Sequence, residues 1–131
     1  MTPAPLKIKL HRRSQTLELV YPEAAYELTA EYLRVYSPSA EVKGHGPGQE
    51  SLQTGKRHVQ ITSVEPQGNY AIKLVFDDGH NSGIYSWPYL HNLSVNQKSL
   101  WEDYLRRLHD ANQFREPGVS VVQLLNPKPN P

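Results

Sequence analysis

Two short stretches of this chain carry side chains that could do chemistry. Residues 44–48 place His45 among glycines, and residues 77–80 place two carboxylates next to His80. Imidazole and carboxylate groups bind iron or zinc, and two histidines with one carboxylate hold iron in many oxygenases. His45, His80 and Asp78 are therefore the candidate metal ligands, and these two histidines are the only ones we would test.

Other features of the sequence limit this metal hypothesis. The chain has no cysteine, which excludes a disulfide framework, a thiolate zinc site and an iron–sulfur cluster bound by its own thiolates. No two of its histidines have the i, i+4 spacing of a helical zinc motif. No serine has a G-x-S-x-G context, so the sequence predicts no catalytic residue. The alternative interpretation of residues 77–80 is a solvated hairpin turn.

The glycine-rich stretch is also a candidate phosphate-binding loop. A Walker loop continues from its glycines into Lys-Ser or Lys-Thr, and this chain does not. Pro47 also removes one backbone N–H donor. The pattern favours a tight loop whose glycines adopt positive φ.

Length, charge and hydropathy limit the classes of protein to which this chain can belong. A chain of 131 residues is one domain in size, which we assign to residues 1–115, with a proline-rich C-terminal tail over 116–131. The net charge of +1 gives no bulk attraction to nucleic acid or an anionic membrane. No apolar run is long enough to cross a membrane, and the first residues lack a secretory signal. We expect a cytoplasmic protein with no nucleic-acid or membrane partner.

The elements expected from hydrophobic periodicity form a small α+β domain. Alternation predicts strands over residues 6–10 and 16–20 as an N-terminal hairpin, and strands over 58–64, 70–76 and 80–86 as a central meander. Helical spacing predicts two main helices over 23–35 and 96–114, with a short helix over 87–93. The second main helix could instead begin at Ser99, which has capping-box spacing with Glu102. We expect this antiparallel sheet to pack against the two main helices.

Three further expectations concern the core and the connections. Trp101, Leu105 and Leu108 should pack on the sheet face formed by residues 72, 74 and 76 or by their alternate neighbours. Residues 37–53 lack periodicity and form a long loop, a feature that is uncommon unless functional or mobile. Residues 119–125 are apolar enough for an added strand or a partner-binding segment.

Several blocks of this sequence resemble the small bacterial DUF971 family, also called γ-butyrobetaine hydroxylase-like N-terminal domains. The resemblance runs over about residues 6–108. It is carried by Leu33-Arg34-x-x-Ser37-Pro38-Ser39, Gly44-His45-Gly46-Pro47, Gly68-Asn69-Tyr70, Phe76-Asp77-Asp78-Gly79-His80 and Gly83-Ile84-Tyr85. In the hydroxylases, a separate domain carries the iron and 2-oxoglutarate chemistry. The resemblance therefore implies an accessory or docking role rather than hydroxylase activity, as does the fusion of such domains to iron–sulfur carrier ATPases.

The resemblance also implies a place for a site. The N-terminal domain of those hydroxylases resembles a zinc module of three cysteines and one histidine. The matching positions here are Ser37, Ser39, Val42 and His80. One imidazole cannot supply the four ligands of structural zinc, so the site looks degenerate.

These observations lead to one hypothesis with one rival. We expect a non-catalytic module that binds a protein partner or a small polar ligand through the 34–48 segment and the turn that ends at His80. The candidate binding residues are Arg34, Ser37, Ser39, Val42, His45, Asp77, Asp78 and His80. The rival is a domain that binds iron or zinc and is linked to iron–sulfur or dioxygenase systems.

Overall fold

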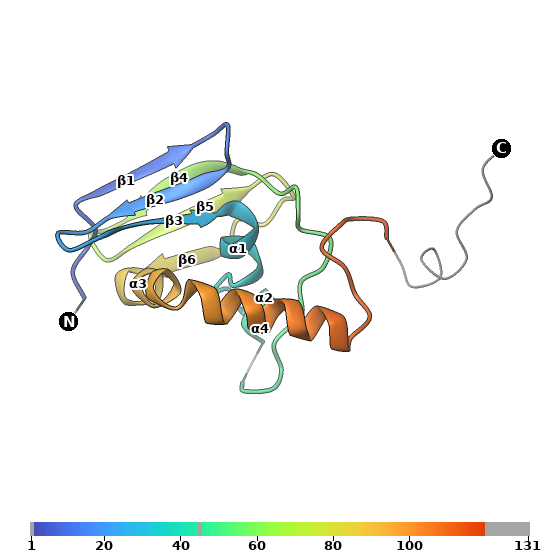
Figure 1. Ribbon diagram of the computed structural model, residues 1–131. Helices are drawn as coiled ribbons and strands as arrows, with labels where there is room; N and C mark the ends of the chain where they lie inside the picture. The colour runs from blue at the N-terminus through green and yellow to red at the C-terminus, as the bar shows by residue number, and fades with distance from the viewer. Residues whose placement is uncertain (1, 45, 120–131) are drawn as a thin grey trace.

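The computed structural model describes residues 2–44 and 46–119 as an α+β fold (Figure 1). Its strands form two three-stranded antiparallel sheets, in the orders β1-β2-β3 and β4-β5-β6. The predicted fold class is confirmed, although the strands divide into two sheets. The elements are β1 (Lys7–His11), β2 (Thr16–Val20), β3 (Ala25–Thr29), α1 (Ala30–Val35), α2 (Ala40–Lys43), β4 (Ile61–Gln67), β5 (Ala71–Phe76), β6 (Gly83–Ser86), α3 (Trp87–Val95) and α4 (Gln97–Asp110).

The N-terminal hairpin lies where alternation predicts it. β1 and β2 pair antiparallel from Lys7↔Val20 to His11↔Thr16. Alternation along β2 buries Leu17 and Leu19 completely and leaves their neighbours partly exposed. The first sheet thus has one face in the core and one toward solvent, as expected of an antiparallel sheet.

The helix predicted over residues 23–35 is wrong in its first half. β3 occupies that half, pairs with β2 and buries Leu28, and the helix begins only at Ala30. The Thr29 side chain accepts a hydrogen bond from the backbone N–H of Tyr32 at 3.1 Å and so caps α1. The helical spacing behind this prediction includes Ala25 and Leu28, which both lie on β3, and hairpin pairing with the preceding strand β2 overrode that spacing.

The second sheet departs from prediction at its ends. β4 runs on through Pro66 and Gln67, beyond the predicted end at residue 64. Proline is tolerated there because β4 is an edge strand, and its outer edge needs no N–H donor. β6 begins at Gly83 rather than at residue 80. The intervening turn is closed by the Phe76 N–H, which donates to the His80 carbonyl at 2.9 Å, and Gly79 has φ +90°. His80 therefore lies on a connection and not on a strand.

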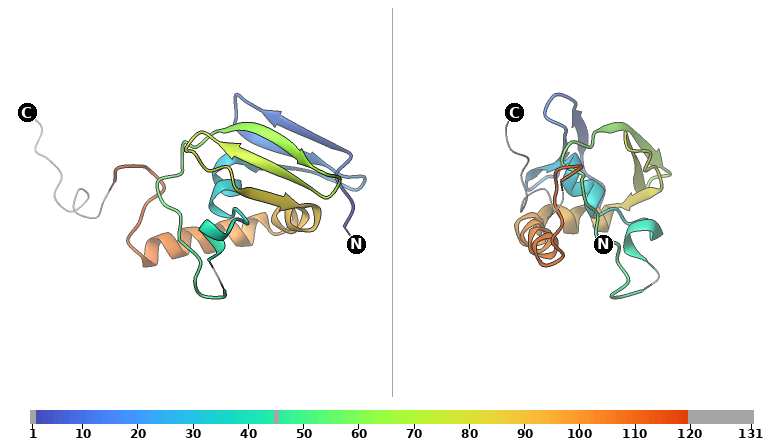
Figure 2. Two further views of the ribbon diagram at one scale, coloured as in Figure 1. Left: turned by 180° about the vertical axis from the view of Figure 1, so that it is seen from behind. Right: turned by 90° about the vertical axis from the view of Figure 1, so that its right-hand side faces the viewer.

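Both sheets contribute to one hydrophobic cluster. It joins buried side chains of β2 and β3 with those of β4, β5 and β6, and it includes Tyr32 and Leu33 of α1 and Leu90 and Leu93 of α3. Figure 2 shows the two sheets from behind and end-on, with α4 running below them. The sheets therefore form two layers over a shared core.

The predicted packing of α4 is only partly right. Trp101 is half-buried against the main cluster, whereas Leu105 is 38% exposed. Leu108 belongs to a second cluster with Val35 and Tyr104. Leucines of α3 fill the space beside the sheets, so α4 packs instead toward α1 and the segment that follows it.

The chain turns back after α4, which ends at Asp110 rather than at residue 114. Asn112 has φ 53°, and the following residues pair with the segment before β4. The Gly55 N–H donates to the Phe114 carbonyl at 2.9 Å, and the Arg57 N–H donates to the Arg115 carbonyl at 3.1 Å. The expectations for residues 120–125 and for the rest of the tail lie outside the described residues. Among the described residues, no helix has the length and apolar character needed to cross a bilayer.

Candidate functional site

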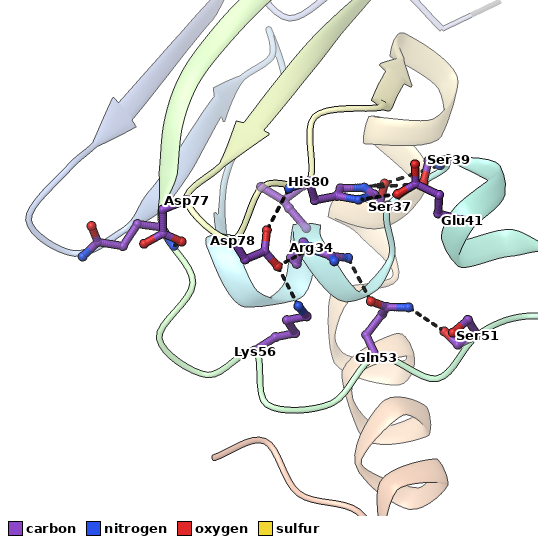
Figure 3. A network of polar contacts seen from close by, with 12 residues as sticks. Arg34, Ser37, Ser39, Glu41, Ser51, Gln53, Lys56, Asp77, Asp78 and His80 are labelled. Atoms are coloured by element: carbon purple, nitrogen blue, oxygen red, sulfur yellow. Dashed lines mark hydrogen bonds and ion pairs between the residues drawn. The ribbon is translucent and has the colours of Figure 1, made fainter. Parts of the chain in front are cut away.

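The end of α1 and the β5–β6 turn meet at a buried imidazole. α1 ends at Val35, and the extended chain after it brings Ser37 and Ser39 against His80 (Figure 3). The His80 Nε2 atom lies 2.8 Å from the Ser37 hydroxyl and 3.4 Å from the Ser39 hydroxyl. Ser37 is completely buried and His80 is 5% exposed. Residues 43 positions apart thus share one small polar site.

The other ring nitrogen of His80 faces Glu41 from the first turn of α2. Nδ1 lies 3.2 Å from the Glu41 carboxylate, to which the Ser82 hydroxyl also donates a hydrogen bond. Burial lowers the pKa of His80, and the nearby Arg34 charge lowers it further, while Glu41 and Asp78 oppose this. The ring is therefore neutral at pH 7, and the Nδ1–H tautomer donates to Glu41 while accepting from Ser37.

The order hydroxyl, imidazole, carboxylate is that of a nucleophilic triad. However, Ser37 has no exposed surface, so a substrate cannot approach its oxygen. The same oxygen also lies 3.4 Å from the Ser39 backbone N–H, which donates to it. The arrangement therefore orders the chain between α1 and α2 and does not present a nucleophile.

Gly83 is the residue that leaves room for this arrangement. A Cβ atom there would lie 2.6 Å from the Ser37 hydroxyl oxygen and 3.1 Å from the Tyr85 ring. We expect Gly83→Ala to displace the hydroxyl from His80 and to lower the free energy of unfolding by about 1–3 kcal/mol. Chemical denaturation measures the loss, and the His80 ring signals in NMR spectra report the displacement.

Gly46→Ala is the matched control for this substitution. A Cβ at Gly46 meets no atom within 4 Å, so the change is expected to be nearly neutral. Equal effects of the two substitutions would show that the contact between Gly83 and Ser37 does not constrain the site.

A second polar network lies beside the imidazole and is centred on Asp78. Its Oδ2 atom accepts from Arg34 Nε at 2.9 Å and from Lys56 Nζ at 2.6 Å, and its Oδ1 accepts from the His80 backbone N–H at 3.1 Å. Arg34 is buried and also donates to Gln53 at 3.0 Å. Burial raises the pKa of Asp78, but the hydrogen bonds from Lys56, His80 and Arg34 outweigh it and bring the pKa to about 2.

The remaining predicted site residues lie in different places. Val42 is buried on α2, and its carbonyl accepts from the Ser51 N–H at 2.7 Å. Asp77 points away from His80 and accepts from the Gln60 N–H at 2.9 Å (Figure 3). His45 lies outside the described residues.

The residues at the zinc positions implied by the resemblance do not fit zinc. Ser37, Ser39 and Val42 supply two hydroxyls and an aliphatic side chain, and the one imidazole already uses both ring nitrogens in polar contacts. Asp78 faces two cations rather than a metal. Structural zinc takes four thiolate, imidazole or carboxylate ligands.

One group with the composition of a metal site was missed by the sequence analysis. His11, Glu18 and Glu27 lie on the outer face of the first sheet, with candidate ligand atoms within 4.8 Å of one another. Strand alternation with the correct register of β3 would have found it, because Glu18 pairs directly with Glu27. Glu27 is exposed, and nothing else on this face points to a bound ion.

A cleft opens beside the buried imidazole. Its volume is about 390 Å³, within the usual range for small-molecule sites. It is lined by Val35, Tyr36, Ser37, Val42, Lys43, Glu50, Ser51, Tyr89, Asp103 and Arg107. Ser37 and Val42 were predicted site residues, whereas Lys43, Tyr89 and Arg107 were not. α3 and α4 reach the cleft only in the folded chain, and no local pattern marks these residues.

The walls of the cleft combine cations and aromatic rings. Lys43 Nζ lies 4.3 Å from the centroid of the Tyr89 ring, and Arg107 donates to the Tyr36 hydroxyl at 3.2 Å. Asp103 pairs with Arg107 at 3.2 Å, whereas Lys43 makes no ion pair with any residue that the structure describes. The cleft therefore holds an ammonium group beside an aromatic surface, and this group makes no ion pair among the described residues although the Glu50 and Asp103 carboxylates also line the cleft.

Comparisons with known proteins give a family and several similar solved structures. The family model described as gamma-butyrobetaine hydroxylase-like, N-terminal, matches residues 8–91. A protein solved in solution by NMR is 51% identical, with a TM-score of 0.82 over 93% of this chain and 97% of that one. A second NMR structure is 50% identical, with a TM-score of 0.75 over 92% and 90% of the two chains.

A crystal structure carries the same family assignment. It is of a protein of unknown function of the DUF971 family from Acidithiobacillus ferrooxidans, 38% identical, with a TM-score of 0.58 over 69% of this chain and 91% of that one. No curated protein matches this chain.

Proposed function

This chain belongs to the gamma-butyrobetaine hydroxylase-like N-terminal (DUF971) family, and from that premise we propose that it is a non-catalytic module that binds a small polar ligand. The proposed binding site is the cleft between the 35–43 segment, Tyr89 and α4. The ligand class is a carboxylate, either on a small molecule or at the C-terminus of a partner peptide. The relative from Acidithiobacillus ferrooxidans is a protein of unknown function.

One observation carries this proposal: Lys43 lies in a formed cleft with an aromatic wall and no carboxylate partner among the described residues. A carboxylate placed there gains a charge-assisted hydrogen bond from the ammonium group. The Ser51 hydroxyl and the Arg107 guanidinium provide further donors along the wall. The Tyr36 and Tyr89 rings provide apolar contact for the ligand's carbon skeleton.

The buried imidazole supports this role indirectly. Ser37 bonds to His80 and lies buried within the wall of the cleft, behind the residues that are exposed to it. The Arg34–Asp78 ion pair holds the end of α1 against the β5–β6 turn. These contacts position the cleft wall before any ligand arrives, which lowers the entropy cost of binding.

The experiment is an NMR titration of the full chain with succinate, glutarate and triglycine. We expect amide shifts in the 37–43 segment and at Tyr89 and Arg107, since these line the cleft. Lys43→Gln should weaken binding of the best probe by about tenfold, the value of one charge-assisted hydrogen bond.

Lys9→Gln is the matched control, because Lys9 lies on β1 outside the cleft. Unchanged affinity in Lys43→Gln, or shifts that avoid the cleft with every probe, would overturn the proposal.

A further inference from the structure

α1 carries a buried carboxylate that faces residues 111–119, the segment that follows α4. Glu31 belongs to the first turn of α1 and is 6% exposed. A buried charge is strongly unfavourable unless it is paired and hydrogen-bonded. Its partner is Arg115, whose Nε donates to one carboxylate oxygen at 2.8 Å and whose second guanidinium nitrogen donates to the other at 2.7 Å. The pair is bidentate, a geometry that a guanidinium provides and an ammonium does not.

An aromatic ring completes the surroundings of this guanidinium. The Arg115 guanidinium carbon lies 5.1 Å from the centroid of the Trp101 ring of α4. Cations within about 6 Å of an indole face are attracted by its quadrupole. Glu31 and Trp101 together therefore recognise both the charge and the planar shape of an arginine side chain.

Arg115 reaches this place from a short strap, residues 111–119, that follows α4. The strap contacts the segment before β4 through two backbone hydrogen bonds, from Gly55 and Arg57. Glu116 adds an ion pair with His58 at 2.7 Å, and both side chains are more than 40% exposed. The strap contributes no side chain to either hydrophobic cluster. The bidentate ion pair of Arg115 thus joins the strap to a buried side chain of α1, although the Arg115 side chain itself is 33% exposed.

Space lies on both sides of the Arg115 side chain. One cavity of about 340 Å³ is lined by Thr29, Tyr32, Gln97, Lys98 and Trp101, and a second of about 250 Å³ by residues that include Gln15 and His58. Glu31 and Arg115 line both cavities. The Glu31–Arg115 pair therefore lies between two cavities and belongs to the wall of both.

We propose that Glu31 and Trp101 form a binding site for an arginine side chain. In this structure Arg115 of the same chain fills the site. When the strap leaves, an arginine of a partner peptide takes its place, and the adjoining cavities hold the residues next to that arginine. This site is separate from the carboxylate-binding cleft proposed above, and neither proposal depends on the other.

The test measures whether the emptied site binds an arginine-containing peptide added in solution. The full chain with Arg115→Ala is titrated with a peptide that copies residues 111–119, and with the same peptide carrying alanine at the arginine position. We expect the arginine peptide to shift the Trp101 indole signal and to raise the melting temperature of this variant. The alanine peptide should bind at least tenfold more weakly. The unsubstituted chain should bind the arginine peptide at least tenfold more weakly than the variant, because its site is filled.

Two further variants test the role of the carboxylate and replace Arg115→Ala if that variant does not fold. Glu31→Gln combined with Arg115→Ala removes the carboxylate, and it should lose the preference for the arginine peptide. If Arg115→Ala does not fold, Arg115→Lys keeps a cation near Glu31 and takes its place in the titration. Equal binding of the two peptides, or an arginine preference that survives loss of the Glu31 carboxylate, would overturn the proposal.

Discussion

Replacing Tyr85 with alanine is expected to lower the free energy of unfolding by about 3–5 kcal/mol, the usual cost of deleting a buried aromatic ring. Tyr85 on β6 has no exposed surface. Its hydroxyl donates to the Leu33 carbonyl at 2.5 Å and so ties the second sheet to α1. Burial raises the pKa of Tyr85, so the hydroxyl stays protonated and remains a donor. Urea denaturation followed by circular dichroism measures the effect.

Two variants separate the contributions of the ring and the hydroxyl. Tyr85→Phe keeps the ring and leaves the Leu33 carbonyl without its partner, which should cost about 1–3 kcal/mol. Tyr70→Ala removes a tyrosine that is 59% exposed and should change stability by less than about 0.5 kcal/mol. A loss below about 1 kcal/mol for Tyr85→Ala would mean that this ring does not join β6 to α1.

The second large effect is a loss of stability in acid that depends on Asp78. The pKa of Asp78 is lowered from 3.8 to about 2 in the folded protein. A lowered pKa in the folded state stabilises the fold above the unfolded pKa, and the contribution disappears as the pH falls through the folded pKa. The stabilisation is therefore complete above about pH 4 and lost by about pH 2. The Asp78 side chain is 22% exposed, and solvent screening reduces its value to about 1–2 kcal/mol.

Measuring unfolding free energy between pH 2 and pH 6 tests this expectation. Asp78→Asn should be less stable than the unsubstituted chain at pH 6, and the difference should shrink toward pH 2. Asp110→Asn is the control, because Asp110 is 63% exposed and pairs with Arg106 in solvent. If Asp78→Asn and the unsubstituted chain lose stability in parallel, the ion pairs of Asp78 contribute nothing to folding.

Local sequence patterns predicted a strand or helix correctly where its apolar residues keep one periodicity from end to end. The hairpin of β1 and β2, the strands of the meander and both C-terminal helices lie within a few residues of their predicted places. Alternation fixes which face of a strand is buried, and the spacing of Leu100, Trp101, Tyr104 and Leu108 fixes one face of α4. These features depend on residues that are near one another in the chain.

Patterns failed where a boundary lay inside a run of apolar residues. The step from β3 to α1 falls between Leu28 and Tyr32, whose separation suits a helix. Only the antiparallel pairing of β3 with β2 distinguishes the two structures, and the apolar spacing along residues 25–32 does not reveal that pairing. Leu105 was predicted to pack on the sheet but is partly exposed. Helical spacing shows which residues share a face of the helix, but it does not show which element that face packs against.

The residues of the candidate site divide in the same way. The family resemblance predicted that Ser37, Ser39 and His80 lie close together, and their hydroxyl-to-imidazole distances of 2.8 Å and 3.4 Å agree with that prediction. Only the tertiary structure decided what that site is. It buried Ser37 under Gly83, placed Glu41 on the second ring nitrogen, and opened the cleft between Lys43, Tyr89 and Arg107. The exposure of these side chains to solvent and their hydrogen-bond partners depend on how elements distant in sequence pack together, and no pattern along one segment encodes that packing.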